Sequence, residues 1–359
     1  MKITKITTDT LSVPLKKPFK TALRTVHAIE NVLVRVETDE GLIGLGEAAP
    51  TALITGDTFP AIEGAIRGPI AAALTGHPLD DFDGLMAALH GALLKNTSAK
   101  AAVDMALYDL RAQSLGVPLY KLLGGNKQRL DTDITISLNS TETMVSDSLE
   151  AVEAGFRILK IKVGRDPAND PQTIAEIRQA VGADVILRVD PNQGWTPKEA
   201  VRAILLIEDK GCDVELVEQP VHALDINGLR FVTERVQTPI LADECMFSPQ
   251  DAEEIIRTRA ADYLNIKLMK TGGIYQALKI CALAETHRVQ CMMGCMLEAK
   301  ISVGAAAHLA AGKGIIRMVD LDGPALCAAD PFTGGPVFNG PGITMTGDPG
   351  LGVRLQAFE

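Results

Sequence analysis

A repeated unit that begins after residue 130 constrains the fold of this chain more than any other feature. A short apolar strand is followed by an amphipathic stretch of about ten to fifteen residues, and the unit then recurs. The expected strands are 132–138, 157–163, 184–190, 213–218, 239–243, 262–267, 289–294 and 315–322. Eight evenly spaced strands that alternate with helices favour a closed parallel barrel of the (β/α)8 type over a doubly wound open sheet.

The first 125 residues show a different pattern. Two alternating strands are expected within 31–48, joined by a turn that ends at Gly41. A helix is expected between an N-cap at Ser98 and an end at Gly116. We therefore expect three parts: an α+β capping domain over 1–125, the barrel over 126–322, and a segment over 323–359 that returns to the capping domain.

Composition limits the classes of partner. The chain carries 35 Lys and Arg against 45 Asp and Glu, a formal charge of −10, which argues against a nucleic acid or an anionic membrane. No apolar run approaches the ~18–20 residues of a spanning helix, and the alternating first residues are unlike a signal peptide. The six Cys show no paired spacing. They indicate reduced thiols in a cytoplasmic protein, and the sequence allows a homo-oligomer.

Ionisable residues occur at the ends of successive expected strands. Lys162, Asp190, Glu218, Asp243 and Lys267 follow one another at steps of 28, 28, 25 and 24 residues. Each step is one strand–helix unit, so the side chains should meet at the C-terminal end of the barrel, where catalytic groups lie. One such residue alone is more often a helix cap or a solvated charge. Five in register are hard to explain that way, because burying several charges together is costly.

Strand parity indicates which side chains face the barrel interior. In LKIKV, the apolar Leu159 and Ile161 share one face and must meet the helices, so Lys160 and Lys162 point inward. The same alternation places Asp320 and Asp322 of the last strand inward, with the intervening leucine outward. The alternative is a purely structural role, in which Asp320 only caps a loop.

The residue types predict a magnesium-assisted proton transfer. Asp190, Glu218 and Asp243 are hard oxygen donors, and no His or Cys occurs with them at these strand ends. Such a ligand set suits Mg²⁺ better than Zn²⁺. Lys162 and Lys267 flank them, and a divalent cation could lower a lysine pKa from about 10.4 to ~7–8. One lysine would take an α-proton next to a carboxylate and the other would return a proton to the opposite face. The metal, with Lys160, would stabilise the enediolate.

Three features resemble the enolase superfamily, in its muconate-lactonizing-enzyme subgroup. They are the KxK pair at 160–162, the NIKLMKTGG segment, and the three carboxylates of Asp190, Glu218 and Asp243, here called the carboxylate ladder. The resemblance implies a (β/α)7β barrel, Mg²⁺ on the three carboxylates, and Lys162 and Lys267 as the two bases. It also implies residues around the metal and residues near the substrate. The first set is Asn192, Glu244 and Asn265. The second set is Thr21 and Ile54, in loops at 17–25 and 51–58 that the family folds over the barrel mouth, and Glu298, whose role is either substrate-proximal or structural.

The subgroup holds cycloisomerases, o-succinylbenzoate synthases, N-acylamino-acid racemases and dipeptide epimerases. Two carboxylates at Asp320 and Asp322 suit a free α-ammonium and would repel muconate or an N-succinyl tail. This pair resembles the dipeptide epimerases, and PFKTALRT resembles the L-Ala-D/L-Glu epimerase loop whose arginine, here Arg24, meets the glutamate carboxylate. An isolated arginine is more often a solvated surface residue.

The resemblance therefore implies Mg²⁺-dependent epimerisation of an L-Ala-L-Glu type dipeptide at its C-terminal residue, in murein peptide recycling. The alternatives are an N-acylamino-acid racemase, a muconate-type cycloisomerase, and a non-catalytic barrel that senses dipeptides.

Overall fold

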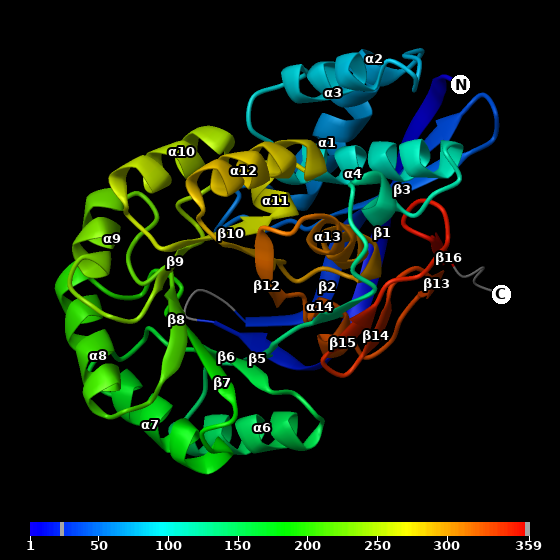
Figure 1. The fold of residues 1–359 in the computed structure, drawn as a ribbon. Coiled ribbons are helices and arrows are strands. Elements are labelled where there is room, and N and C mark those ends of the chain that lie inside the picture. The colour runs from blue at the N-terminus through cyan, green and yellow to red at the C-terminus, as the bar shows by residue number, and fades with distance from the viewer. Residues whose placement is uncertain (22–24, 356–359) are drawn as a thin grey trace.

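The computed structural model describes residues 1–21 and 25–355 and shows an α/β barrel beside a strand-rich N-terminal domain (Figure 1). Eight parallel strands form one sheet in the order β12-β11-β10-β9-β8-β7-β6-β5. They are β5 (Ile134–Ile136), β6 (Ile158–Lys162), β7 (Ile186–Asp190), β8 (Val214–Glu218), β9 (Ile240–Ala242), β10 (Tyr263–Lys267), β11 (Cys291–Gly294) and β12 (Ile316–Asp320). Every one lies within an expected strand, which confirms the barrel.

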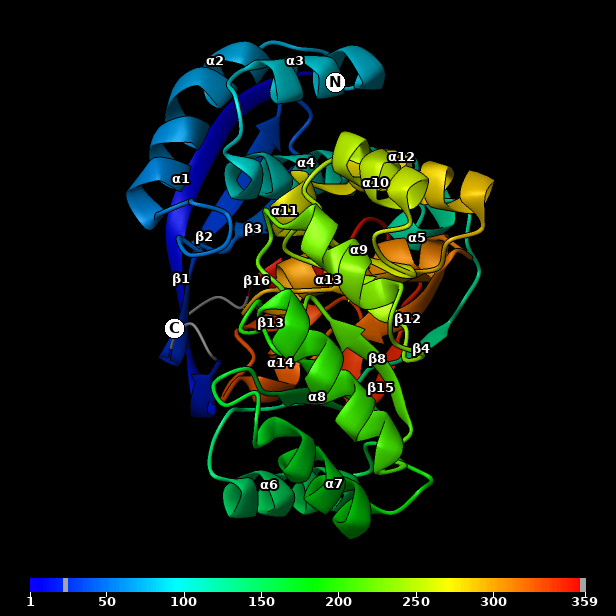
Figure 2. The ribbon, with the colours of Figure 1, turned by 90° about the vertical axis from the view of Figure 1, so that its left-hand side faces the viewer.

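Helices cover the outside of the barrel (Figures 1 and 2). Several begin where the sequence places a polar cap: Ser140, Thr196, Asp225 and Ser248 each accept a hydrogen bond from a backbone N–H of the first turn. Within residues 1–21 and 25–355, the only helix after the last barrel strand is the four-residue α14, so the barrel is of the (β/α)7β kind. The helices are α6 (Thr141–Glu153), α7 (Asp170–Val181), α8 (Pro197–Asp209), α9 (Ile226–Thr233), α10 (Pro249–Thr258), α11 (Leu268–Thr271), α12 (Ile274–His287), α13 (Lys300–Gly312) and α14 (Gly323–Leu326).

The first and last barrel strands meet through side chains. Between β5 and β12 the described residues form no backbone ladder. Instead, Leu321 N donates to Thr132 Oγ1 at 2.8 Å, and Thr135 N donates to Asp322 Oδ2 at 2.7 Å. The second bond fixes a carboxylate of the last strand at the mouth of the barrel.

The N-terminal domain is an antiparallel sheet of β1 (Ile3–Lys20), β2 (Thr25–Thr38) and β3 (Ile43–Ala48), with helices on one side. The turn between β2 and β3 ends at Gly41 (φ +84°), as predicted. A Cβ at Gly46 would overlap the Ala102 carbonyl, so α4 packs directly on β3. The helices of this domain are α1 (Phe59–Ala65), a π-helical turn η1 (Ile66–Ile70), α2 (Ala71–Leu74), α3 (Phe82–Gly91), α4 (Thr97–Ser114) and α5 (Leu119–Leu122).

The start of α4 differs from the expectation. The helix begins at Thr97, so Ser98 is not its N-cap; the Ser98 N–H donates to Asp57 Oδ2 at 2.9 Å. A carboxylate from a distant loop therefore replaces the local cap. The helix ends at Ser114, shortly before the left-handed Gly116 (φ +66°), close to the expected end.

The segment after residue 323 contacts both parts of the molecule. Ala328 N donates to the Pro14 carbonyl in β1 at 2.8 Å, and Leu351 N donates to Asp109 Oδ1 in α4, also at 2.8 Å. The segment also pairs β15 with β4. The remaining strands are β4 (Arg129–Asp131), β13 (Phe332–Gly334), β14 (Val337–Asn339), β15 (Gly342–Thr344) and β16 (Val353–Leu355).

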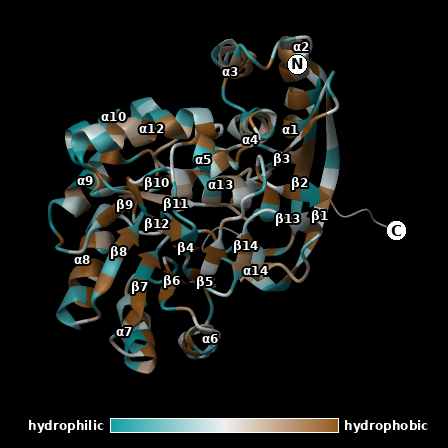
Figure 3. Ribbon diagram, turned by 45° about the vertical axis from the view of Figure 1, so that its right-hand side comes forward, coloured by the Kyte–Doolittle hydropathy of each residue, from teal (hydrophilic) through white to brown (hydrophobic). Residues whose placement is uncertain are grey.

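Apolar side chains fill the space between the strands and the helices, and several barrel strands contain brown, hydrophobic stretches (Figure 3). Inside the barrel a small separate cluster of apolar side chains supports the charged groups at the mouth. It consists of Leu216, Leu241, Met292 and Met318. Among the described helices, none is long and apolar enough to cross a bilayer.

A buried histidine should make stability depend on pH. His308 in α13 is fully buried and its Nδ1 accepts from Tyr120 N at 3.0 Å. Burial lowers the pKa of His308 to about 4, from an ordinary value near 6.5. The unfolded chain therefore binds this proton first as the pH falls, so stability present above about pH 6.5 is lost toward pH 4.

We expect the substitution His308→Asn, which keeps an acceptor for Tyr120, to remove this dependence. Between pH 7 and 4.5, urea unfolding should show wild type losing about 2 kcal/mol more than the variant. Burial also raises the pKa of Asp109 to about 6, which acts with the opposite sign but is common to both proteins. Equal losses in the two proteins would contradict a neutral buried imidazole.

Candidate active site

The predicted ionisable residues converge at the C-terminal ends of the barrel strands. Lys162, Asp190, Glu218 and Lys267 end β6, β7, β8 and β10, and Asp243 directly follows β9. All five side chains are buried. Because three strands lie between β6 and β10, the two lysines approach the carboxylates from opposite sides of the mouth.

Ammonium groups surround the three carboxylates. Lys162 Nζ lies 2.6 Å from Asp190 Oδ2, and Lys267 Nζ lies 2.7 Å from Asp243 Oδ2. Lys160, which points inward as parity predicts, occupies the centre. Its Nζ is 2.7 Å from Glu218 Oε2 and 3.2 Å from Asp190 Oδ2.

These contacts set the charges of the carboxylates. Burial alone would raise the pKa of Asp190, but Lys162 and Lys160 outweigh it and lower that pKa. At Asp243, burial is likewise outweighed by Lys267 and Lys270, which hold its pKa far below its usual value. Burial dominates at Glu218, assisted by the neighbouring carboxylates, and raises its pKa to about 7.

One of the two lysine bases, Lys267, shows the opposite pKa shift from the one expected beside a cation. Burial would lower the pKa of Lys267, but Asp243 and Glu218 outweigh it and raise that pKa well above its usual value. The pKa of Lys160 is raised too, since Asp320 and Glu218 outweigh its burial. A lowered lysine pKa therefore requires that a cation displaces these ammonium groups from the carboxylates.

The three side chains expected around the metal lie against the ladder. Asn192 N donates to Asp190 Oδ1 at 2.8 Å, and Asn192 Nδ2 lies 3.3 Å from Glu244 Oε1. Asn265 Nδ2 donates to Glu218 Oε1 at 2.9 Å. Burial, with Asp243 and Asp190 nearby, raises the pKa of Glu244 to about 8.

The donor set fits a hard divalent cation. Several buried oxygens here accept no well-formed hydrogen bond, although two of them touch an ammonium group. They are Asn192 Oδ1, Glu218 Oε2, Asp243 Oδ1, Glu244 Oε2 and Asn265 Oδ1. Within the described ranges, no three His, Cys, Asp or Glu side chains have a spacing that could hold an ion as they stand, and ammonium groups lie between the carboxylates. Oxygen-only ligands with unmet acceptor capacity are what Mg²⁺ requires.

The two aspartates at the C-terminal end of β12 differ in pKa. Asp320 Oδ2 accepts from Lys160 Nζ at 2.8 Å, and Lys160 outweighs burial to lower the pKa of Asp320 to about 2. Burial and the nearby Asp320 raise the pKa of Asp322 to about 6. Asp322 precedes α14, yet its side chain makes no cap hydrogen bond there. The contacts thus favour a role in the cavity over loop capping.

A cavity of about 60 Å³ opens over this cluster. Thr21 and Ile54 line it, so both capping-domain segments reach the mouth as the resemblance implies, but residues 17–20 belong to β1 and Thr25 to β2, not to a loop. Arg24 lies outside the described residues. The lining residues include Phe19, Thr21, Leu53, Ile54, Thr135, Lys160, Lys162, Asn192, Lys267, Cys295, Met296, Asp320, Asp322 and Leu326.

Glu298 does not line this cavity. Its carboxylate accepts from Met296 N at 2.5 Å and from the Ser302 hydroxyl in α13. Of the two roles open for this residue, the contacts favour the structural one, holding the end of β11 against the following helix.

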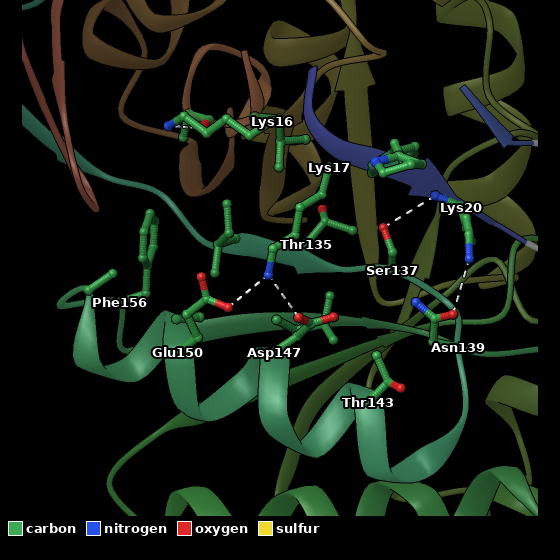
Figure 4. Close-up of a pocket in the computed structure, with 18 residues that line it drawn as sticks. Lys16, Lys17, Lys20, Thr135, Ser137, Asn139, Thr143, Asp147, Glu150 and Phe156 are labelled. Atoms are coloured by element: carbon green, nitrogen blue, oxygen red, sulfur yellow. Dashed lines mark hydrogen bonds and ion pairs between the residues drawn. The ribbon is translucent and has the colours of Figure 1, made fainter. Parts of the chain in front are cut away.

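A larger cavity of about 630 Å³ lies outside the barrel, between β1, β5 and α6 (Figure 4). Lys17 crosses it to reach Glu150 and Asp147 of α6, at 2.7 and 3.1 Å. Phe19, Thr135 and Leu326 line both cavities and so form the wall between them.

Two buried residues of the site were missed in the sequence. Lys270 Nζ lies 2.6 Å from Asp243 Oδ1, and Gln219 Oε1 accepts from Asp243 N at 2.9 Å. A signal for both existed, since each stands in a motif that begins with a predicted site residue: EQP at 218–220 and KLMK at 267–270.

Comparison with known proteins places the chain in a family. Residues 143–358 match the model described as enolase C-terminal domain-like, and residues 3–124 match the mandelate racemase/muconate lactonizing enzyme N-terminal domain. The chain therefore belongs to the enolase superfamily, in its mandelate racemase and muconate lactonizing enzyme branch.

Its relatives include several epimerases. An L-Ala-D/L-Glu epimerase of Clostridium acetobutylicum is 54% identical over 96% of both chains. The substrate-liganded L-Ala-D/L-Glu epimerase of Bacillus subtilis has a TM-score of 0.98 at 51% identity and covers all of both chains. The dipeptide epimerase of Enterococcus faecalis, in complex with Mg and L-Leu-L-Tyr, has a TM-score of 0.95 at 40% identity, covering 98% of this chain and 99% of that one.

Proposed function

We propose that this protein is a Mg²⁺-dependent dipeptide epimerase, an isomerase that inverts the C-terminal residue of L-Ala-L-Glu and related dipeptides. The observation that carries the proposal is the placement of two lysines on opposite sides of a buried carboxylate ladder, beside a second pair of carboxylates. Relatives of the same fold and full length are named as epimerases of this kind.

Lys162 and Lys267 are proposed as the acid–base pair. Each ammonium group reaches the ladder from its own side of the mouth, so a substrate between them presents opposite faces of its α-carbon to the two lysines. One lysine removes the α-proton and the other delivers a proton to the opposite face. Each epimer is then the substrate of one lysine and the product of the other.

Asp190, Glu218 and Asp243 are proposed to hold Mg²⁺, with Asn192, Glu244 and Asn265 orienting them. When bound, the ion supplies positive charge for the substrate carboxylate as negative charge develops on it. Lys160 lies beside the same carboxylates and adds a second positive charge.

Asp320 and Asp322 are proposed to bind the free ammonium of the dipeptide. Their buried carboxylates line the cavity at the end of β12, where a neutral N-acyl group would bring no positive charge to balance them. This observation favours a dipeptide over an N-acylamino acid or muconate. Arg24 is proposed as the partner of the glutamate side chain, and Thr21 and Ile54 as part of the lid over the substrate.

Proton NMR tests the function. L-Ala-L-Glu is incubated in D₂O with the protein, with and without Mg²⁺. We expect Mg²⁺-dependent loss of the glutamate α-proton signal and the appearance of L-Ala-D-Glu. A protein that binds the dipeptide without exchanging this proton would be a sensor; exchange only with N-succinylamino acids would make it a racemase.

The wall between the two cavities should limit the first residue of the dipeptide. Its side chain is attached beside the ammonium, and therefore faces the corner formed by Phe19, Thr135 and Leu326. Phe19→Ala should open this corner to the outer cavity and raise kcat/KM for L-Leu-L-Glu relative to L-Ala-L-Glu at least about tenfold. Ala151→Leu, which fills the outer cavity, should cancel the gain in the double variant. An unchanged ratio for Phe19→Ala would contradict this assignment.

Two further assignments belong with this proposal. The first is the domain organisation: a capping domain over 1–125, the barrel over 126–322 and a C-terminal segment over 323–359. A cytoplasmic role in recycling murein dipeptides agrees with six free cysteines in the described residues, since such thiols persist in a reducing compartment. Cell fractionation, and growth on L-Ala-D-Glu of a strain that lacks the protein, test the location and the role.

A further inference from the structure

The KLMKTGG segment, which begins with Lys267, contains a second lysine that the proposed mechanism does not use. Lys270 lies in α11, the single helical turn that follows the base, and its side chain is fully buried. A lysine is rarely buried to this degree unless it is paired, so its contacts should reveal what it does.

The polar contacts of Lys270 lie at Asp243, a proposed metal ligand, and at the neighbouring Asn265, and its ammonium group also lies 6.0 Å from the centre of the Phe247 ring. Its Nζ is 2.6 Å from Asp243 Oδ1, and it donates to the Asp243 carbonyl at 2.5 Å and to the Asn265 carbonyl at 3.0 Å. One ammonium group therefore fixes both the side chain and the backbone of Asp243, and it ties β9 to β10 at the level of the ladder.

The two oxygens of Asp243 face different lysines. Oδ2 lies against Lys267, which must leave it in order to act on a substrate, whereas Oδ1 lies against Lys270, which is fully buried and does not line the cavity. Gln219 Oε1 holds the Asp243 N–H from the other side. With Oδ1 held against Lys270, Oδ2 is the oxygen that becomes available to an ion once Lys267 moves away.

The turn that carries Lys270 is itself held by the capping domain. The neighbouring Met269 sulfur accepts from Ala49 N at 3.3 Å. The Asp104 carboxylate of α4 accepts from Ile274 N at 2.6 Å and approaches so closely that only glycine fits at position 273. The ammonium group of Lys270 thus lies on a rigid support.

We propose that Lys270 is a positioning residue that orients Asp243 for one-oxygen binding of Mg²⁺. The inference rests on the proposed function, because it assumes that Asp243 is a metal ligand. Removing a group that orients a metal ligand typically weakens metal affinity 10- to 100-fold. Lys270 neither touches the substrate nor moves a proton.

Titration calorimetry of Mg²⁺ into the full-length protein tests this proposal without reference to activity. We expect Lys270→Met, which keeps the length of the side chain but removes its charge and donors, to raise the Kd for Mg²⁺ at least tenfold. Lys127→Met is the matched control, because Lys127 also donates to two backbone carbonyls but lies away from the ladder. Its Kd should stay within twofold of wild type.

A Kd within twofold of wild type for a folded Lys270→Met protein would overturn the proposal. If that variant does not fold, Lys270→Gln, which keeps one donor for the carbonyls, is measured against the same criterion. The failure of the proposed function would look different: wild type itself would then bind no Mg²⁺, or would bind it without exchanging the α-proton of any dipeptide.

Discussion

Replacing either Lys162 or Lys267 with alanine is expected to lower epimerisation by at least about 10³-fold while leaving α-proton exchange for only one epimer. General acid–base groups contribute about 10²- to 10⁴-fold. Both lysines are needed to convert one epimer into the other, but each alone still faces the α-proton of one of them. The two variants should therefore exchange opposite epimers.

The measurement is proton NMR in D₂O on L-Ala-L-Glu and L-Ala-D-Glu separately, with each variant. Mg²⁺ binding serves as the control for site integrity. Each substitution removes an ammonium group that competes for Asp190 or Asp243, so the affinity for Mg²⁺ should stay equal or increase. Turnover like that of wild type, or exchange of both epimers by one variant, would rule out the two-base mechanism.

The barrel was predictable because its signal is local and repeats. Each strand is a short apolar run, and parity within LKIKV was enough to turn Lys160 and Lys162 inward. The spacing of the ionisable residues then placed them at a common height, since strands in a parallel barrel end on the same side. The register of β6 and β7, in which Lys162 stands opposite Asp190, follows from these constraints.

Contacts between distant segments were not predictable in this way. Asp57 replaces the expected cap at Ser98, and Thr132 helps to close the barrel, because each partner lies far away in the sequence. Lys270 was missed for a related reason. From the sequence, a lysine one turn beyond the base is expected to be a solvated charge. Only the structure shows that its ammonium group lies against Asp243.

The pKa of Lys267 shows another limit of the sequence. A lowered pKa was expected from a cation and a second ammonium, but the pKa of Lys267 depends on how closely Asp243 and Glu218 approach it. In the structure, the attraction of these two carboxylates raises the pKa of Lys267 more than burial lowers it. The net direction depends on distances of a few ångströms, which residue types and spacings do not determine.

The last-strand carboxylates lead to the second large effect. Asp322→Asn keeps the size of the side chain and an oxygen for the Thr135 N–H, but it removes the negative charge proposed to bind the dipeptide ammonium. Removing one member of a buried charge pair costs roughly 2–5 kcal/mol, so kcat/KM for L-Ala-L-Glu should fall about 10²-fold or more. Asp322 is the cleaner position, because Asp320 also binds Lys160. The double variant with Asp320→Asn should lose activity further.

An N-acetylated substrate separates recognition of the ammonium from general damage to the site. N-acetyl-L-Ala-L-Glu has no charged amine, so wild type should strongly prefer the free dipeptide and Asp322→Asn should lose most of that preference. The affinity for Mg²⁺ should remain within about threefold of wild type, because Asp322 does not contact Asp190, Glu218 or Asp243 in the described structure. If the substitution lowered activity on both substrates by the same factor, Asp322 would support the fold of the mouth, and dipeptide specificity would have to come from elsewhere in the cavity.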